Sequence, residues 1–217
     1  TRSVKLLSLA FTVTGDEKYL FKAVENLEMW FLDKKTRMNP NLNYGQTIPG
    51  HNNGLGRGEG LIDTYNFVEM LDGVEILRAS KKFPKKIEAG LKEWFSKFLD
   101  WMLTSPIGIE EYKANNNHGT AYDVQVARFA LFADKTDIAL KYVTNFASLR
   151  IYKQIEPNGA QPLELARTTA FGYSVFNLTH MLDMCIIANS IGLDVINAIS
   201  PDGRSIQKAV EFLLPFA

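Results

Sequence analysis

Apolar residues recur at intervals of three and four through most of this chain, and no long stretch alternates apolar and polar residues. The first pattern is typical of helices with one buried face, whereas alternation is typical of half-buried strands. We therefore predict an all-α fold. The expected helices cover residues 2–14, 16–34, 60–80, 84–103, 119–133, 135–150, 171–191 and 203–216.

The connections between these helices fall into two classes. Shorter connections with Gly, Asp, Thr or Pro join the expected helices in consecutive pairs, as in helical hairpins. Three longer connections, at about 35–59, 104–118 and 151–170, are rich in Asn, Gly and Pro. Successive hairpins joined in this way predict a toroid, with the long connections emerging at one end and able to bring polar groups together.

Composition limits the kinds of protein that this chain can be. With 217 residues, of which 46% are hydrophobic, we expect one domain over residues 1–217, cut from a longer chain because it starts without Met and without a signal peptide. The 24 basic and 24 acidic residues cancel, which argues against nucleic-acid binding. No apolar stretch approaches the roughly 20 residues that span a bilayer, and Cys185 is expected to pack as a small hydrophobic residue.

The first long connection carries a glycine-rich segment around Arg57 and Glu59. Glycines let a backbone approach a ligand closely, and the Arg57 guanidinium suits a carboxylate. The spacing fits neither of the common phosphate-binding loops. The alternative is a surface loop in which Arg57 pairs with Glu59 or Asp63.

The second connection ends in an Asn run followed by His118, directly before a helix. Asn is favoured at helix N-termini, so the run is explained equally well as a structural cap. Alternatively, Asn117 and His118 form a donor pair aimed where an anion would gain from the helix dipole.

The third connection places Arg167 just before the helix that holds Tyr173, Asn177 and His180. The last three residues share one helical stripe, and a polar stripe on an otherwise apolar helix costs desolvation unless something pairs with it. It could line a cleft, or Tyr173 could be an ordinary core residue.

Other chemistries are weaker. His51, His118 and His180 lack zinc-site spacing and no Cys cluster accompanies them, so we expect no metal and no cofactor. No GxSxG nucleophile motif occurs. A glycoside hydrolase needs two carboxylates at suitable separation; the candidates near the long connections are Glu59, Asp63, Asp123 and Glu164.

Three segments in this order resemble motifs of the alginate lyase superfamily of polysaccharide lyases. They are Gly54-x-Gly56-Arg57-Gly58-x-Gly60-x-Ile62-Asp63, Asn116-Asn117-His118-Gly119-Thr120-x-Tyr122-Asp123-x-Gln125, and Gln161-Pro162-x-Glu164-x-x-Arg167-Thr168-x-x-x-x-Tyr173-Ser174-x-x-Asn177-Leu178. The resemblance spans about 130 residues, and three ordered motifs are more specific than any one of them.

The resemblance implies an incomplete (α/α) toroid and β-elimination on a uronate polysaccharide, alginate-like or glucuronan-like. It implies that Asn117 and His118 neutralise the substrate carboxylate, and that Tyr173, with Arg167 beside it, acts as acid and often also as base. A periplasmic or extracellular location is implied as well. We expect the substrate to be bound by Arg57, Glu59, Asn116, Tyr122, Gln125, Glu164 and His180. The alternatives are a toroidal glycoside hydrolase and a helical scaffold that binds glycan or protein without chemistry.

Overall fold

The computed structural model describes residues 1–217 and contains helices but no strands, which confirms the all-α prediction. Contacts divide the chain into two compact units, residues 1–108 with 129–135, and residues 109–128 with 136–217. The toroid, and the expectation that residues 1–217 form one catalytic domain, stay predictions. None of the helices has the length and apolar character that a bilayer-spanning segment requires.

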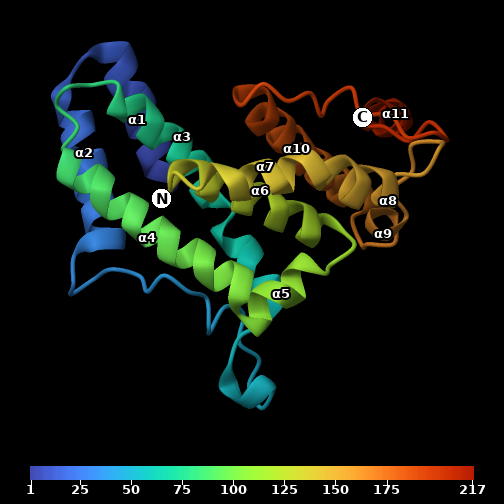
Figure 1. Cartoon of the computed structure of the whole chain (residues 1–217), viewed down its shortest axis with the longest axis horizontal. Coiled ribbons are helices and arrows are strands. Elements are labelled where there is room, and N and C mark those ends of the chain that lie inside the picture. The colour runs from blue at the N-terminus through green and yellow to red at the C-terminus, as the bar shows by residue number, and fades with distance from the viewer. The chain divides into compact units, whose positions relative to one another are not determined.

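The first unit is built on four helices, coloured blue to green in Figure 1. They are α1 (Arg2–Thr14), α2 (Glu17–Leu27), α3 (Asn66–Arg78) and α4 (Lys85–Thr104), with a π-helical turn at Glu28–Leu32 and 3-10 turns at Asn52–Gly54 and Gly58–Thr64. α1 packs against both α2 and α3. The predicted turn between α1 and α2 is confirmed: Gly15 adopts a left-handed φ of 68°, and Asp16 accepts a hydrogen bond from the Lys18 amide at 3.0 Å.

The core of the first unit is aromatic. Its rings meet mostly edge to face or tilted, with neighbouring centroids 4.8 to 6.5 Å apart, an arrangement that aromatic quadrupoles favour. The rings belong to Phe31, Phe67, Trp94, Phe95, Phe98, Phe129 and Phe132.

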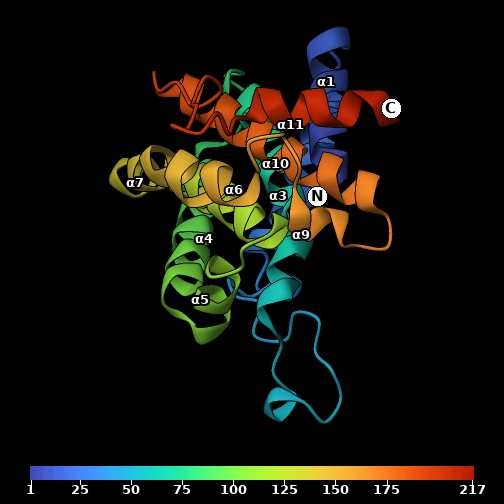
Figure 2. The same ribbon diagram turned by 90° about the vertical axis from the view of Figure 1, so that its right-hand side faces the viewer.

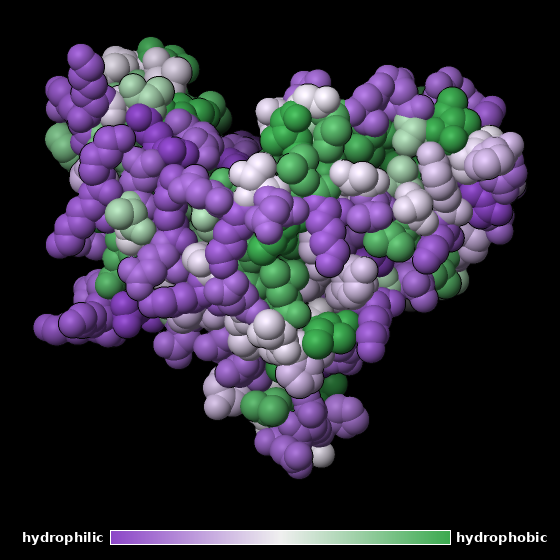
Figure 3. All heavy atoms as spheres, viewed as in Figure 1, coloured by the Kyte–Doolittle hydropathy of each residue, from purple (hydrophilic) through white to green (hydrophobic).

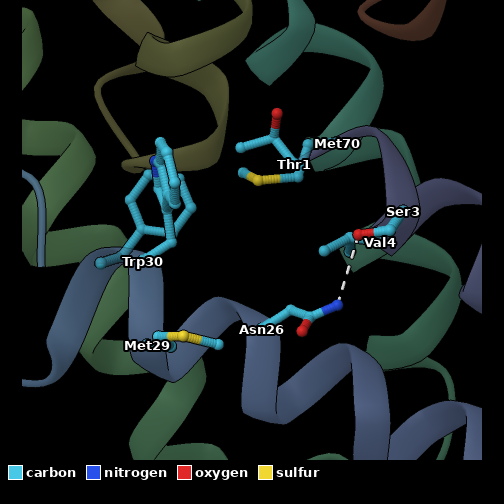
Figure 4. A pocket seen from close by; sticks show the side chains of 8 residues that line it. Thr1, Ser3, Val4, Asn26, Met29, Trp30 and Met70 are labelled. Atoms are coloured by element: carbon cyan, nitrogen blue, oxygen red, sulfur yellow. Dashed lines mark hydrogen bonds between the residues drawn. The ribbon is translucent and has the colours of Figure 1, made fainter. Parts of the chain in front are cut away.

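A cavity of about 160 Å³ opens beside this core (Figure 4). Met29, Trp30 and Met70 give it an apolar wall, and the Asn26 amide donates to the Ser3 hydroxyl at 3.3 Å on its polar side. None of the residues selected from the sequence lines this cavity.

The second unit, coloured from lime to red in Figures 1 and 2, contains the longest helix, α10. Its elements are α5 (Pro106–Tyr112), α6 (Asn117–Phe132), α7 (Thr136–Phe146), a π-helical turn (Ala147–Ile151), α8 (Tyr152–Gln154), α9 (Pro162–Leu165), α10 (Ala170–Ser190), α11 (Ile206–Leu213) and a 3-10 turn (Leu214–Phe216). The first residues of α5 and the last of α6 belong to the first unit. α10 packs against α9 and α11.

Two of the connections expected to lack secondary structure contain short helices. Connection 104–118 holds α5, and connection 151–170 holds α8 and α9. Pro begins both α5 and α9, at a position where its missing N–H costs nothing. The Ser105 hydroxyl also accepts from the Gly108 amide at 3.0 Å, which caps α5. The Pro and Ser residues that mark these helix starts can be seen in the sequence, but each helix is too short to show an apolar periodicity.

Candidate functional site

Arg57 and Glu59 belong to the first unit. The Arg57 guanidinium donates to the Gln46 side chain at 2.9 Å, Gln46 donates to Asp63 at 3.1 Å, and Arg57 Nε lies 3.9 Å from a Glu59 oxygen. These contacts match the alternative prediction of a surface loop in which Arg57 pairs within the loop. Gln46 bridges Arg57 and Asp63.

Two glycines of this loop, Gly56 and Gly60, allow it to pack on itself. A Cβ atom added at Gly56 or Gly60 would collide with the backbone of Gly45, so these positions allow two stretches of the same loop to touch. Gly56 and Gly60 therefore have a structural role inside the loop, and ligand binding by this loop stays a prediction.

In the second unit, the N-terminus of α6 is held by a carboxylate from α9. Glu164 accepts from the Asn117 backbone amide through one oxygen and from the Asn117 side-chain amide through the other, both at 2.7 Å. A negative charge at this position gains from the helix dipole and satisfies a backbone N–H that the helix itself cannot use.

This arrangement places a protein carboxylate where the sequence predicted a substrate anion. Asn117 is 0% exposed and Glu164 1% exposed. The direction of the Asn117 amide is also fixed, because turning it over would set its carbonyl oxygen against a Glu164 oxygen. Both residues face each other in the interior, and neither offers a surface to a ligand in this conformation.

His118, the next residue, is partly exposed and has a buried partner that the sequence analysis missed. Its Nδ1 lies 2.7 Å from Oε1 of Glu111, near the end of α5. The side chain of His118 is 16% exposed and that of Glu111 only 2%. The His118 backbone amide donates to the Asn116 side chain at 3.2 Å, so Asn116 supports the turn into α6.

Arg167 and Tyr173 form a direct pair. Arg167 Nη2 donates to the Tyr173 hydroxyl at 2.9 Å, and the guanidinium carbon lies 4.0 Å from the centre of the Tyr173 ring. Both side chains are partly exposed. The pair is set by the entry into α10, which begins at Ala170 between them.

A continuous chain of hydrogen bonds connects these groups. Asn117 bonds to the Glu164 carboxylate, the Glu164 backbone carbonyl accepts from the Arg167 amide at 3.1 Å, and the Arg167 guanidinium bonds to Tyr173. The second unit therefore links Asn117, Arg167 and Tyr173, three of the four residues expected to be catalytic, through Glu164, while His118 directly follows Asn117 in the chain.

Behind the site lies a network of buried amides centred on Gln154 of α8. The Gln154 carbonyl oxygen accepts from the Thr120 hydroxyl and the Asn177 amide, both at 2.9 Å, and its own amide donates to the Asn116 backbone carbonyl at 3.2 Å. Asn177 also donates to Gln161 at 2.8 Å. These partners offset the desolvation of the polar stripe on α10.

A buried ion pair fixes the segment that leads into α6. Arg150 donates to both oxygens of Asp123, at 2.7 and 3.0 Å, and to the backbone carbonyls of Tyr112 and Ala114, at 2.8 and 2.7 Å. Burial raises the pKa of Asp123, and the guanidinium opposes this shift. Arg150 thus anchors the residues between Glu111 and Asn116.

The comparisons with known proteins agree on one family. The alginate lyase family model matches residues 1–217. The chain belongs to the alginate lyase family.

A crystal structure of an alginate lyase from Bacteroides ovatus is similar to this family member, with a TM-score of 0.96 and 55% sequence identity. The match covers 99% of this chain and 57% of the Bacteroides ovatus chain, so this chain spans little more than half of that length. The search of curated proteins gave no match.

Several residues expected to bind substrate lie in the interior of this alginate lyase family member. Tyr122, Gln125 and His180 are at most 1% exposed, so their side chains have no surface open to a sugar in this conformation. Tyr122 packs against Tyr112 and Tyr142, with ring centroids 5.7 and 6.3 Å away. Burial raises the pKa of Tyr122, and it raises that of Tyr142 to about 12, so both phenols stay protonated well above neutral pH.

His180 is held neutral inside the second unit. Burial, and secondarily the charge of His118, lower its pKa to about 3, while the Asn117 backbone opposes the shift. Its ring meets Phe176 edge to face at 4.2 Å. No group of three or more His, Cys, Asp or Glu side chains is arranged to hold a metal ion.

The depressed pKa of His180 predicts acid sensitivity. Below about pH 6.5 the unfolded chain takes up a proton at this residue and the folded chain does not, so the free energy of unfolding falls as pH falls towards 3. We expect His180 to account for about 3 kcal/mol of the stability lost between pH 7 and pH 4. Urea unfolding of the His180→Gln variant should show a correspondingly smaller loss over this range.

The matched control is His51→Gln, which removes an exposed histidine. It should leave the pH dependence of unfolding close to that of the wild type. Equal pH dependence in the wild type and His180→Gln would show that His180 is not held neutral.

Proposed function

We propose that this chain carries the catalytic groups of a polysaccharide lyase that cleaves a uronate polysaccharide, alginate-like or glucuronan-like, by β-elimination. The observation that carries the proposal is the Arg167–Tyr173 pair, which holds a partly exposed phenol against a permanent cation in a member of the alginate lyase family. The Bacteroides ovatus structure is that of an alginate lyase, which supports the substrate class.

The chemistry explains why these residue types are needed. Elimination removes the proton at C5, forms a double bond between C4 and C5, and breaks the bond from C4 to the glycosidic oxygen, which takes up a proton. Negative charge builds up beside an existing carboxylate when the C5 proton leaves. Donors that strengthen as this charge forms lower the barrier.

Tyr173 serves as the acid in this proposal. Its oxygen already accepts a hydrogen bond from Arg167, so the hydroxyl hydrogen is directed elsewhere and can be donated to the leaving oxygen. The guanidinium stabilises the phenolate that remains. Arg167 is thereby a partner of the acid, and its remaining donors are suited to the sugar carboxylate.

The base depends on the stereochemistry of the eliminated groups. Tyr173 serves as both base and acid if the C5 proton and the leaving oxygen lie on the same face of the sugar. His118 is the base if they lie on opposite faces, because His180 is 1% exposed and cannot reach a sugar.

In this proposal Asn117 supports the site and does not contact the substrate. The family resemblance implied direct contact with the substrate carboxylate, but in this conformation its amide is bonded to Glu164 and the residue is fully buried. We assign the direct contacts to His118, Arg167 and Tyr173, and we assign to Asn117 and Glu164 the task of holding the start of α6.

A hydrolase mechanism is less well supported. Of the carboxylates that it could use, Asp123 is paired with Arg150 and Glu164 with Asn117, and both are at most 1% exposed. Neither can activate water beside a sugar without giving up these partners.

The test is to incubate the full-length protein with alginate, glucuronan, hyaluronan and a heparin-type chain. We expect ultraviolet absorbance from a conjugated, unsaturated product on at least one of them. New reducing ends without this absorbance would establish a hydrolase instead. Binding without any cleavage would leave a non-catalytic scaffold. We also propose a periplasmic or extracellular site of action, where such polymers are met.

A further inference from the structure

Glu111 is a buried carboxylate that none of the three sequence motifs contains. It lies on α5, seven residues before His118, and its Oε1 is 2.7 Å from Nδ1 of the His118 ring. A buried carboxylate is costly unless a partner satisfies it. Its side chain is 2% exposed, whereas that of His118 is 16% exposed, so the histidine is the member of the pair that can meet a ligand.

The contact favours one tautomer of His118. An ionised carboxylate only accepts hydrogen bonds, so with Glu111 ionised the hydrogen lies on Nδ1. The Nε2 atom of the neutral ring is then left with a lone pair and can accept a proton. The carboxylate also stabilises the positive ring that results from this proton transfer.

The residues that follow Glu111 hold it in place. Arg150 binds the backbone carbonyls of Tyr112 and Ala114 directly after Glu111. On the other side, the His118 backbone amide is bonded to Asn116. Both partners of the contact are therefore positioned by the backbone and do not depend on flexible side chains alone.

We propose that Glu111 is a positioning residue for elimination in which the C5 proton and the leaving oxygen lie on opposite faces of the sugar. It holds His118 with hydrogen on Nδ1 so that Nε2 accepts the C5 proton of the uronate. This inference rests on the proposed lyase function. The proton moves from C5 to Nε2 while the Nδ1 hydrogen stays in place, and Tyr173 protonates the leaving oxygen. Glu111 itself gains and loses no proton.

The experiment combines nuclear magnetic resonance with kinetics, using protein labelled with ¹⁵N at histidine. His51→Gln and His180→Gln variants assign the signals of the three histidines. In the wild type at neutral pH we expect hydrogen on Nδ1 of His118. In Glu111→Leu we expect a shift towards hydrogen on Nε2, since the acceptor at Nδ1 is gone.

The kinetic arm compares Glu111→Leu, Glu111→Gln and Glu110→Gln. We expect kcat to fall roughly 10- to 100-fold in Glu111→Leu with a much smaller change in KM. Glu111→Gln retains an acceptor oxygen and should be intermediate, and it covers the case in which the Leu variant fails to fold. Glu110→Gln, which removes the same charge at the exposed neighbouring residue, should keep wild-type kcat and tautomer.

Two results would overturn the inference: hydrogen on Nε2 in the wild type, or wild-type kcat in both Glu111 variants of an active enzyme. A wild type that gives no unsaturated product from any polysaccharide would instead refute the lyase function, whatever tautomer His118 adopts.

Discussion

Replacing Tyr173 by Phe should abolish formation of the unsaturated product while leaving the fold intact. The change removes one oxygen, the atom that accepts from Arg167 at 2.9 Å and that we assign as the proton donor. Loss of a general acid costs about 10²- to 10⁴-fold in rate, and more if the same phenol is also the base. We therefore expect kcat/KM, followed by ultraviolet absorbance on the preferred polysaccharide, to fall at least about 10³-fold.

The control is Tyr152→Phe, a hydroxyl deletion in the same unit at a residue outside the site. It should retain wild-type kcat/KM, and both variants should melt within a few degrees of the wild type. Substantial activity in Tyr173→Phe would remove Tyr173 from the mechanism and, with it, the observation on which the proposed function rests.

Replacing Gly119 by Ala should cause the largest loss of stability. A Cβ atom at this position would collide with the Ala114 carbonyl oxygen and with the Arg150 guanidinium. Relief requires Arg150 to move, and Arg150 is itself 4% exposed and bonded to Asp123 and to two backbone carbonyls. We expect a loss of about 3 kcal/mol in the free energy of unfolding, because overpacking and disruption of a buried ion pair combine.

Gly172→Ala is the matched control, measured in the same urea titration. Its Cβ would have nothing nearer than Thr169, at 3.7 Å, and it lies in the first turn of α10. Since Ala favours a helix over Gly, this variant should be as stable as the wild type or more stable by up to about 1 kcal/mol. If both variants unfold at the same urea concentration, the predicted collision of a Cβ at residue 119 with Arg150 does not destabilise the protein.

The helices were largely predictable from sequence because periodicity and turn residues are local signals. The turn at Gly15 and Asp16 lies where the sequence placed it, and α10 begins and ends within one residue of the expected 171–191. The short helices α5 and α9 escaped detection, since seven and four residues contain too few turns for a pattern.

The site was predictable only where its residues are close in the chain. Arg167 and Tyr173, six residues apart, were expected to act together and do form a pair. The partners of Asn117 and His118 were not found, because Glu164 is 47 residues away and Glu111 belonged to a connection without an expected helix. Burial was a further gap: a motif names polar residues but does not say which of them face inward.

Figure 3 shows apolar residues at several places on the surface of the molecule. Apolar side chains are also exposed along α10. They are Phe171, Val175, Phe176, Leu182 and Ile186. Sequence periodicity could not separate this face from the buried one, because α10 is apolar on most sides.

The hydrogen bonds of Gln154 have a consequence for altering what such an enzyme cuts. One side chain joins the loop before α6, the first turns of α6 and the middle of α10. These segments are therefore coupled through one side chain. If one of them alone is exchanged for a homologous segment, a buried amide in another loses its hydrogen-bond partner. Directed evolution towards a new polymer should draw its productive changes from outward-facing positions such as Thr168 and Phe171, while the coupled segments are inherited whole.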